Sequence, residues 1–325
     1  MYFSDIIGQE HIVSHLQKAI KAGKVSHAYI IQGDEGSGKR MLAATLAATL
    51  LCEEGGTEPC GICPSCKRAF TRNNPDIRYV VHEKAAISVK EVREQLVNDV
   101  MVKPYSGRYK VYIIDEAEKM NEAAQNAILK TIEEPPEYVV IMLLTVNSKL
   151  FLQTILSRCV LLNLRPVKKP EIIRLLVENH GVSPYLAAVA ADFSDGVPGR
   201  AINYATSDEF ISLKDEVTKI LKRAPGMNAP ERYELIKDLA GRKKEIPDMI
   251  PLMRLWFRDL LVEKTTKGGS PIIFSDEERD IISQAEQNSL NDIAKKMEAV
   301  ETLKYRLENS INLEVSLELF LKTIR

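Results

Sequence analysis

Long apolar runs, an excess of charge of one sign and a secretion signal are all missing from this chain of 325 residues. Its most apolar predicted strand, Val139 to Val146, is far shorter than the ~20 residues that a membrane-spanning helix requires. The first residues, MYFSDIIGQE, carry acids where a secretion signal has a basic and then an apolar stretch. The 44 Lys and Arg and 45 Asp and Glu give a formal net charge of −1, which argues against a protein that coats nucleic acid by charge alone. We therefore expect a cytoplasmic protein that has no membrane partner.

Cysteine is scarce, and because cytoplasmic thiols stay reduced, disulfides are not expected. Four of the five cysteines nevertheless fall in one window with the spacing C-x7-C-x2-C-x2-C, and no histidine lies among them. Zinc prefers soft thiolates in a tetrahedron, and C-x2-C steps form tight knuckles that supply them. The spacing predicts a closed, structural Zn²⁺ site in an insertion at about 52–66, against the alternative of a chance cluster of free thiols. The predicted ligands are Cys52, Cys60, Cys63 and Cys66.

Short β-rich runs alternate with helix-forming segments between about residues 28 and 165. Near-continuous apolar strands separated by helices indicate a parallel sheet that is covered on both faces. Ligands on such a sheet bind at the carboxyl ends of its strands. The predicted strands are AYIIQ (28–32), IRYVV (77–81), YKVYIID (109–115), YVVIMLLT (138–145) and CVLLNL (159–164), and the helical segments between them include MLAATLAATLL, VKEVREQLVNDV and NEAAQNAILKTIEE.

The β signal ends after RPVKKP, and only helical patterns follow it. Segments 170–180, 183–193 and 199–206 predict a small helical module, and a further all-helical stretch runs from about 210 to the end. Trp256 lies in an apolar helical window, where packing in a core is the expected role. The predicted domains are an α/β nucleotide-binding domain at 1–165, a helical module at 166–208 and a second helical domain at 209–325.

The segment GDEGSGKR, from Gly33 to Arg40, follows a predicted strand and precedes a predicted helix. In such a loop the glycines let backbone N–H groups turn inward around a phosphate, and the helix presents its positive end. A working loop has Ser or Thr at the last position to hold Mg²⁺, whereas Arg40 has no acceptor and repels the metal. We expect a site that holds ATP or ADP but hydrolyses it poorly or not at all; the alternative is slow turnover in which water substitutes for the hydroxyl. The predicted nucleotide-binding residues are Gly33, Gly36, Ser37, Gly38, Lys39, Arg40 and Asn147, which ends a later strand.

Asp115 and Glu116 end the strand VYIIDE. In an active enzyme the first carboxylate would orient Mg²⁺ and the second would polarise the attacking water. Acids after a strand also cap the following helix, but their position relative to the phosphate loop favours the catalytic interpretation. Because Arg40 replaces the metal-binding hydroxyl, both acids are expected to be vestigial.

Five segments occur in a fixed order: DIIGQEHIVSHLQKAI, HAYIIQGDEGSGKR, the four cysteines, IIDEAEKMNEAAQNAILKTIEEPP and ILSRC. Over roughly residues 5–205 they resemble the clamp-loader subunits of bacterial DNA polymerase III, and among these the delta-prime type. The resemblance implies an AAA+ fold with a zinc-bearing nucleotide-binding domain, a helical lid and a collar. It also implies a heteropentameric ring with gamma/tau and delta subunits, which opens the sliding clamp and sets it on primed DNA.

Within this family the SRC motif carries an arginine finger, which the resemblance assigns to Arg158. The finger would act on ATP held by a neighbouring subunit; an ordinary surface or ion-pair arginine is the alternative. In GVPGRA, Gly199 stands where the family has an arginine, and Arg200 follows one helical step, about 100°, later. Together with Arg40, this departure favours an auxiliary subunit over the alternatives, an ATP-hydrolysing gamma/tau-like motor or a DNA helicase.

Overall fold

The computed structural model describes residues 1–325 except 82–85, 244, 271 and 310. The chain divides into two compact units, of which the first is Met1–Glu171 with Gly196–Arg200 and the second is Ile172–Asp195 with Ala201–Arg325. Each unit is described by itself. The division into three domains that the sequence suggests stays a prediction.

A five-stranded parallel sheet forms the centre of the first unit, with the strand order β2-β3-β4-β1-β5. All five predicted strands are confirmed, and their ends lie within a residue of the expected ones. Gln32 pairs with Thr145 on one side and Asn163 on the other, so the carboxyl ends of these three strands lie at one edge. The strands are β1 (Ala28–Gln32), β2 (Ile77–Val80), β3 (Lys110–Ile114), β4 (Val139–Thr145) and β5 (Val160–Asn163).

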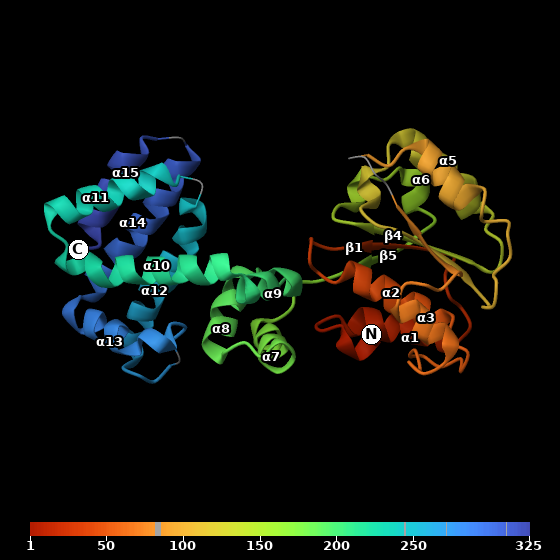
Figure 1. Ribbon diagram of the computed structural model, residues 1–325, viewed down its shortest axis with the longest axis horizontal. Helices are drawn as coiled ribbons and strands as arrows, with labels where there is room; N and C mark the ends of the chain where they lie inside the picture. Colours follow the sequence, from red (N-terminus) through yellow and green to blue (C-terminus); the bar gives the residue numbers. More distant parts are fainter. Residues whose placement is uncertain (82–85, 244, 271, 310) are drawn as a thin grey trace. The chain divides into compact units, whose positions relative to one another are not determined.

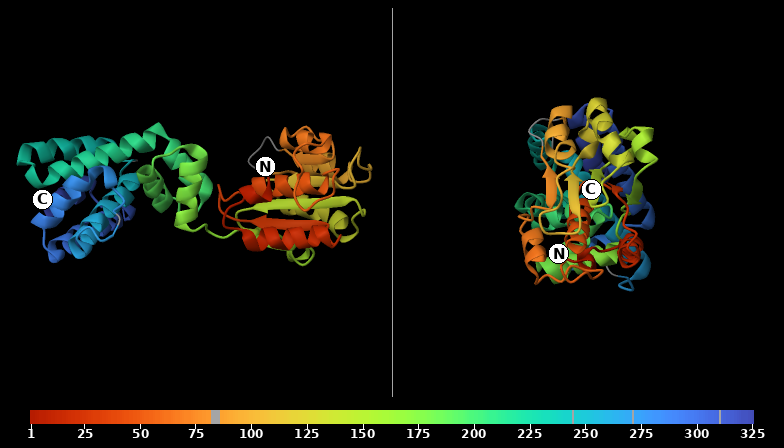
Figure 2. Two further views of the ribbon diagram at one scale, coloured as in Figure 1. Left: turned by 90° about the horizontal axis from the view of Figure 1, so that it is seen from below. Right: turned by 90° about the vertical axis from the view of Figure 1, so that its right-hand side faces the viewer.

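Helices cover both faces of this sheet, as the apolar strands require (Figure 1). Leu16, Leu46 and Met142 belong to the core on one face, and Leu96, Ile128 and Leu143 to the core on the other. Seen from below in Figure 2, the strands run side by side with helices on both sides of them. The first face is covered by α1 (Glu10–Lys21), α2 (Lys39–Leu50) and α3 (Pro64–Phe70), and the second by α4 (Val89–Val92), the π-helical η2 (Arg93–Val97), α5 (Glu122–Glu133) and α6 (Gln153–Leu156).

Short 3-10 turns complete the first unit, and the helix expected over 89–100 differs from the prediction. It begins at Val89 as α4 but continues as the π-helical η2 from Arg93. Its start is well defined, because the side chain of Ser88 accepts the N–H of Glu91 while Glu91 reaches back to Ser88. The 3-10 turns are η1 (Phe3–Asp5), η3 (Ala117–Lys119) and η4 (Ser148–Leu150).

The described residues of the second unit contain helices and no strand, which confirms the predicted all-helical region. Trp256 is fully buried in its core, and the indole N–H donates to Gln284 Oε1 at 3.2 Å, so the expected packing role is confirmed. Among the described residues, no helix combines the length and the apolar character needed to span a bilayer. The elements are α7 (Lys169–His180), which begins in the first unit, α8 (Pro184–Phe193), α9 (Pro198–Thr206), α10 (Asp208–Arg223), η5 (Ala224–Gly226), α11 (Ala229–Gly241), α12 (Ile246–Thr266), η6 (Ser275–Glu277), α13 (Glu278–Gln287), α14 (Leu290–Glu308) and α15 (Leu313–Thr323).

Asp76, one residue before β2, fixes the loop that leads into β3. Its buried carboxylate accepts backbone N–H groups from Tyr105 at 2.5 Å, Ser106 at 3.0 Å and Gly107 at 2.9 Å. Burial alone would raise the pKa of Asp76, but the hydrogen bonds from Ser106, Tyr105 and Gly107 together outweigh it and hold the pKa below its ordinary value. The charged form of Asp76 therefore stabilises the fold.

The Asp76→Asn variant is expected to lose about 1–3 kcal/mol of unfolding free energy at pH 7, because charge-assisted hydrogen bonds are replaced by weaker ones. The folded pKa is depressed, so the contribution of Asp76 is present above its unfolded pKa of about 3.9 and is lost as pH falls through the folded value. Urea unfolding of both proteins at several pH values measures the difference. A gap that stays constant between pH 7 and pH 3 would contradict this account.

Candidate functional site

The loop between β1 and α2 has the backbone conformation of a phosphate-binding nest. Gly36 and Gly38 have φ angles of 84° and 94°, a region that glycine adopts without steric cost. The Gly33 N–H donates to Thr145 O at 3.1 Å, which ties the start of the loop to the end of β4. Because α2 begins at Lys39, the unpaired N–H groups of its first turn and its positive dipole end face the loop.

The side chain of Lys39 contacts the start of this loop. Its ammonium donates to the carbonyl oxygens of Gly33 at 2.7 Å and Asp34 at 2.9 Å. Burial is the largest influence on the Lys39 pKa and lowers it, while surrounding carboxylates, Glu118 first, raise it in part. Lys39 thus places a cation directly beside the loop.

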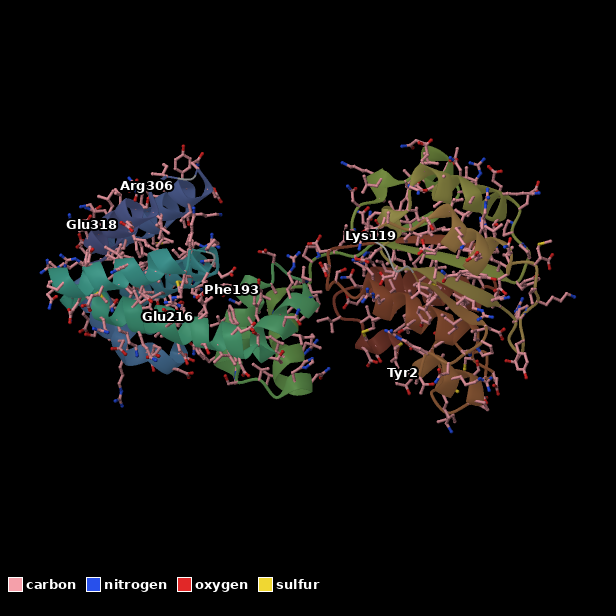
Figure 3. The ribbon with its side chains drawn as sticks, turned by 45° about the horizontal axis from the view of Figure 1, so that its top comes forward. Tyr2, Lys119, Phe193, Glu216, Arg306 and Glu318 are labelled. Atoms are coloured by element: carbon pink, nitrogen blue, oxygen red, sulfur yellow. The ribbon has the colours of Figure 1, made fainter. Side chains whose placement is uncertain are left out.

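Arg40 points from the first turn of α2 to the end of β3, where its Nε donates to Asp115 Oδ2 in an ion pair. The other oxygen of Asp115 accepts the Glu116 N–H at 3.0 Å. Glu116 in turn pairs with Lys119 (Figure 3) through an Oε2–Nζ distance of 2.7 Å. Both acids that a working site would use for Mg²⁺ and water thus have cationic partners within their own chain.

These residues do not fit Mg²⁺. The ion requires oxygen ligands in octahedral geometry, and a phosphate loop normally supplies one from a hydroxyl. Arg40 supplies only N–H donors at this position and occupies the carboxylate of Asp115. The residues of this chain therefore support no catalytic step that uses a bound Mg²⁺.

Asn147 lies at the same sheet edge, two residues beyond the end of β4. Its Oδ1 accepts the Lys149 N–H at 3.1 Å, and its own N–H donates to Thr145 Oγ1 at 3.0 Å. The structure thus brings Asn147, Asp115 and the phosphate loop together at the carboxyl edge.

Gly199 packs directly against the loop. Its N–H donates to Gly36 O at 2.9 Å, and a Cβ at Gly199 would lie 2.8 Å from both the Cα and the carbonyl oxygen of Gly36. No side chain fits there, so the arginine expected from the family pattern is sterically excluded. Arg200 follows with its Nη2 4.0 Å from Asp34 Oδ2, and so lies beside the second residue of the loop.

The four predicted metal ligands form a cluster in which all ligating atoms lie within 4.8 Å of one another. A zinc tetrahedron with ~2.3 Å bonds has S···S edges of about 3.8 Å, and Cys60 Sγ lies 3.9 Å from Cys66 Sγ. Backbone N–H groups of Cys60, Cys63 and Cys66 donate to Sγ of Cys52, Cys60 and Cys63 at 3.3–3.4 Å, as in metal-binding knuckles. Burial raises the pKa of the Cys66 thiol. The cluster can therefore hold a structural metal ion such as zinc, with all four positions filled by protein.

The cysteine module is tied to the amino-terminal segment. Glu58 accepts the Phe3 N–H at 2.9 Å through one oxygen and Gln17 Nε2 at 3.0 Å through the other. Tyr2, labelled in Figure 3, packs edge-to-face on Phe70 with ring centroids 5.9 Å apart. The fifth cysteine, Cys159, lies outside the cluster and is half-buried beside the second core; burial raises its pKa to about 12. Cys159 therefore has the environment of a small hydrophobe.

Arg158 lies after α6 and two residues before β5, at the amino end of this strand. Its Nη1 donates to Thr154 O at 3.0 Å and Ser157 Oγ at 3.1 Å, and its Nη2 is 3.2 Å from Glu133 Oε1. Val160 pairs with Tyr29, so the strand separates Arg158 from the phosphate loop by roughly 13 Å or more. Arg158 and the loop therefore belong to opposite edges of the sheet.

Glu133 was not predicted from the sequence as a partner of Arg158. It stands in the last turn of α5, where a negative charge opposes the helix dipole, and this unfavourable position was the available signal. The contact of Gly199 with Gly36 was also missed, because nothing local in GVPGRA reveals which segment it meets.

Comparisons with known proteins give a consistent result. The protein-family model described as "DNA polymerase III, delta subunit" matches residues 8–168. "DNA polymerase III subunit delta'" of Bacillus subtilis is 28% identical over 326 residues, which cover 95% of this chain and 94% of that protein. "DNA polymerase III subunit tau" of Bacillus subtilis is 31% identical over 292 residues, and there the match spans only 51% of the relative. The solved structure of a DNA polymerase III gamma subunit-related protein from Thermotoga maritima aligns over 96% of this chain and 98% of its own, with 19% identity and a TM-score of 0.42.

The Gly199→Ala variant is expected to separate the 196–200 segment from the phosphate loop, because the added methyl would meet backbone atoms at 2.8 Å. Overpacking of this kind costs about 1–3 kcal/mol. Thermal unfolding measures the loss, and Gly241→Ala is the matched control, since a Cβ at Gly241 meets nothing within 4 Å. Equal melting temperatures for the two variants would show that the contact does not contribute to stability.

Proposed function

The chain belongs to the clamp-loader family of DNA polymerase III as a delta-prime-like subunit, and from this we propose that it is an auxiliary subunit of the loader that acts on a neighbour's ATP. The single observation that carries the proposal is the match to the Bacillus subtilis delta' subunit along almost the whole of both chains. In this proposal the chain joins gamma/tau and delta subunits in a heteropentameric ring. The ring opens the sliding clamp and sets it on primed DNA.

Arg158 is the residue that we propose to act in trans. Its position at the amino edge of the sheet supports this role, because its own phosphate loop is at the carboxyl edge. Three contacts, to Thr154, Ser157 and Glu133, restrain the guanidinium, and the Arg158 side chain as a whole is 40% exposed. A guanidinium restrained in this way loses little conformational entropy when it meets a phosphate.

Hydrolysis of ATP by this chain itself is proposed to be weak or absent. Arg40 supports this part of the proposal in two ways: it stands where a metal would need a hydroxyl, and its ion pair with Asp115 occupies the carboxylate that a metal would also need. The rival function is that of an ATP-hydrolysing motor, either a gamma/tau-like subunit or a DNA helicase. The shorter match to the tau relative favours the auxiliary role.

The helical regions receive the remaining roles. We assign 166–208 to a lid and 209–325 to a collar that holds the ring together. The large buried core around Trp256 supports a helical domain that does not require residues from the first unit, and it also includes Tyr185 and Val189 from the proposed lid.

The metal of the cysteine cluster is proposed to be Zn²⁺ with a structural role. Four thiol ligands leave no open coordination position for chemistry. When bound, the ion would hold the turn between α2 and α3, and through Glu58 the amino-terminal segment.

The Arg158→Ala variant is expected to fold and assemble normally but to slow hydrolysis at the neighbouring ATP site by ~10³–10⁵, the contribution of an arginine finger supplied from outside. Single-turnover ATP hydrolysis by the reconstituted loader with clamp and primed DNA measures this. Arg93→Ala, which removes an exposed arginine of the same unit, is the control. The purified chain alone should show no turnover with or without primed DNA. Unchanged hydrolysis in the Arg158→Ala complex would refute the finger role.

The Cys66→Ser variant is expected to release zinc and to destabilise 52–66, because metal binding in small zinc peptides supplies ~10–16 kcal/mol of apparent free energy. Elemental analysis of the untreated wild-type chain should find about one zinc per chain. Cys159→Ser is the matched control, since this thiol lies outside the cluster. Wild-type protein without any bound metal would end this proposal.

A further inference from the structure

We propose that the phosphate loop of this chain binds nucleoside di- or triphosphates without Mg²⁺, and that Arg40 takes the place of the metal ion. The inference rests on the proposed nucleotide site. It adds that this site binds its ligand without Mg²⁺, which the proposed function does not require. It follows from a mismatch: the backbone is that of a phosphate-binding loop, whereas the side chains around it do not fit a divalent cation.

The phosphate-binding half of the site is complete. The positive φ angles of Gly36 and Gly38 form the nest, and α2 directs its first N–H groups toward it. The nest is supported from outside by two hydrogen bonds, Gly33 N–H to Thr145 O at 3.1 Å and Gly199 N–H to Gly36 O at 2.9 Å. Contacts within the chain therefore hold the loop in this conformation.

The metal-binding half has been replaced. In a magnesium site a hydroxyl and a carboxylate at the end of the neighbouring strand share the ion with the phosphates. Here Arg40 occupies the sequence position of the Ser or Thr that would supply the hydroxyl, and its guanidinium contacts the carboxylate of Asp115. One positive charge and one negative charge are thereby matched within the protein, and a divalent ion would have to displace a cation to enter.

Arg40 also retains groups that a phosphate can use. A guanidinium has five N–H donors. In Arg40 the Nε–H donates to Asp115, and the side chain is 70% exposed. The remaining N–H groups have the planar fork geometry that suits phosphate oxygens. Lys39, now bonded to two carbonyl oxygens of the loop, supplies the second cation.

The loop also carries two acids, Asp34 and Glu35, which oppose a polyphosphate. Arg200, 4.0 Å from Asp34, offsets one of these charges. The site therefore depends on Arg40 for its charge balance, because loss of this residue would add the charge of Asp115 to that of Glu35 against the ligand.

The test is a titration of the full chain with a fluorescent ADP analogue and with ATP as competitor, once in EDTA and once with Mg²⁺ in excess. The wild-type dissociation constant is expected to be the same in both conditions. Arg40→Ser is expected to weaken binding in EDTA by roughly tenfold or more, the value of one charge-assisted hydrogen bond, and to regain it when Mg²⁺ is added. Lys39→Ala should lose binding in both conditions, which locates the ligand in the loop.

A second measurement follows the metal directly. Mn²⁺, a spectroscopic substitute for Mg²⁺, should be held with ADP by Arg40→Ser and not by the wild-type chain, as seen by electron paramagnetic resonance. Wild-type binding that needs Mg²⁺, or no binding of ADP or ATP by the wild-type chain in EDTA, would overturn the proposal. Neither result bears on Arg158, because hydrolysis in the neighbouring subunit is measured separately in the reconstituted loader.

Discussion

The common direction of five parallel strands is the constraint on which the arrangement of this chain depends. It gives the sheet two unlike edges, and the register of β1 with β4 and β5 aligns Gln32, Thr145 and Asn163 at one of them. The phosphate loop follows β1 at that edge. Arg158 precedes β5 and so must stand at the other edge. In the proposed ring, one edge of the sheet would receive a phosphate while the other would present the guanidinium of Arg158 to a neighbouring subunit.

Two of the departures from a working nucleotide site have physical causes that reinforce each other. Gly199 lies so close to Gly36 that no side chain can stand there, and its N–H holds the outer carbonyl of the loop. Arg40, the last residue of the loop motif, forms an ion pair with Asp115. The loop motif is thus held by contacts at Gly36 and at Arg40. A serine at position 40 would supply a hydroxyl and free Asp115 together, but it would leave position 199 without the arginine of the family pattern. A single substitution at either position therefore does not recreate the motor site.

The sequence predicted best what local pattern determines. The three central strands β1, β3 and β4 are apolar and buried on both faces, so their positions follow from the sequence alone. The glycines at 36 and 38 and the C-x2-C knuckles are also found from local pattern. Contacts between distant segments were beyond it. Arg40 and Asp115 are 75 positions apart, and only the fold shows that they meet. The pairing of Arg158 with Glu133 and the fit of Gly199 against Gly36 depend in the same way on tertiary packing.

The acids beside the phosphate loop and the four clustered cysteines differ in the groups that surround them. The carboxylates of Asp115 and Glu116 beside the phosphate loop are partly exposed and form ion pairs with Arg40 and Lys119. The sulfurs of the cysteine cluster are mostly buried, and the contacts recorded for them among the described residues are backbone N–H groups and one another. Burial raises the pKa of the Cys66 thiol and so disfavours its thiolate form. A bound cation would favour that thiolate, whereas beside the phosphate loop Arg40 supplies a positive charge from the chain itself.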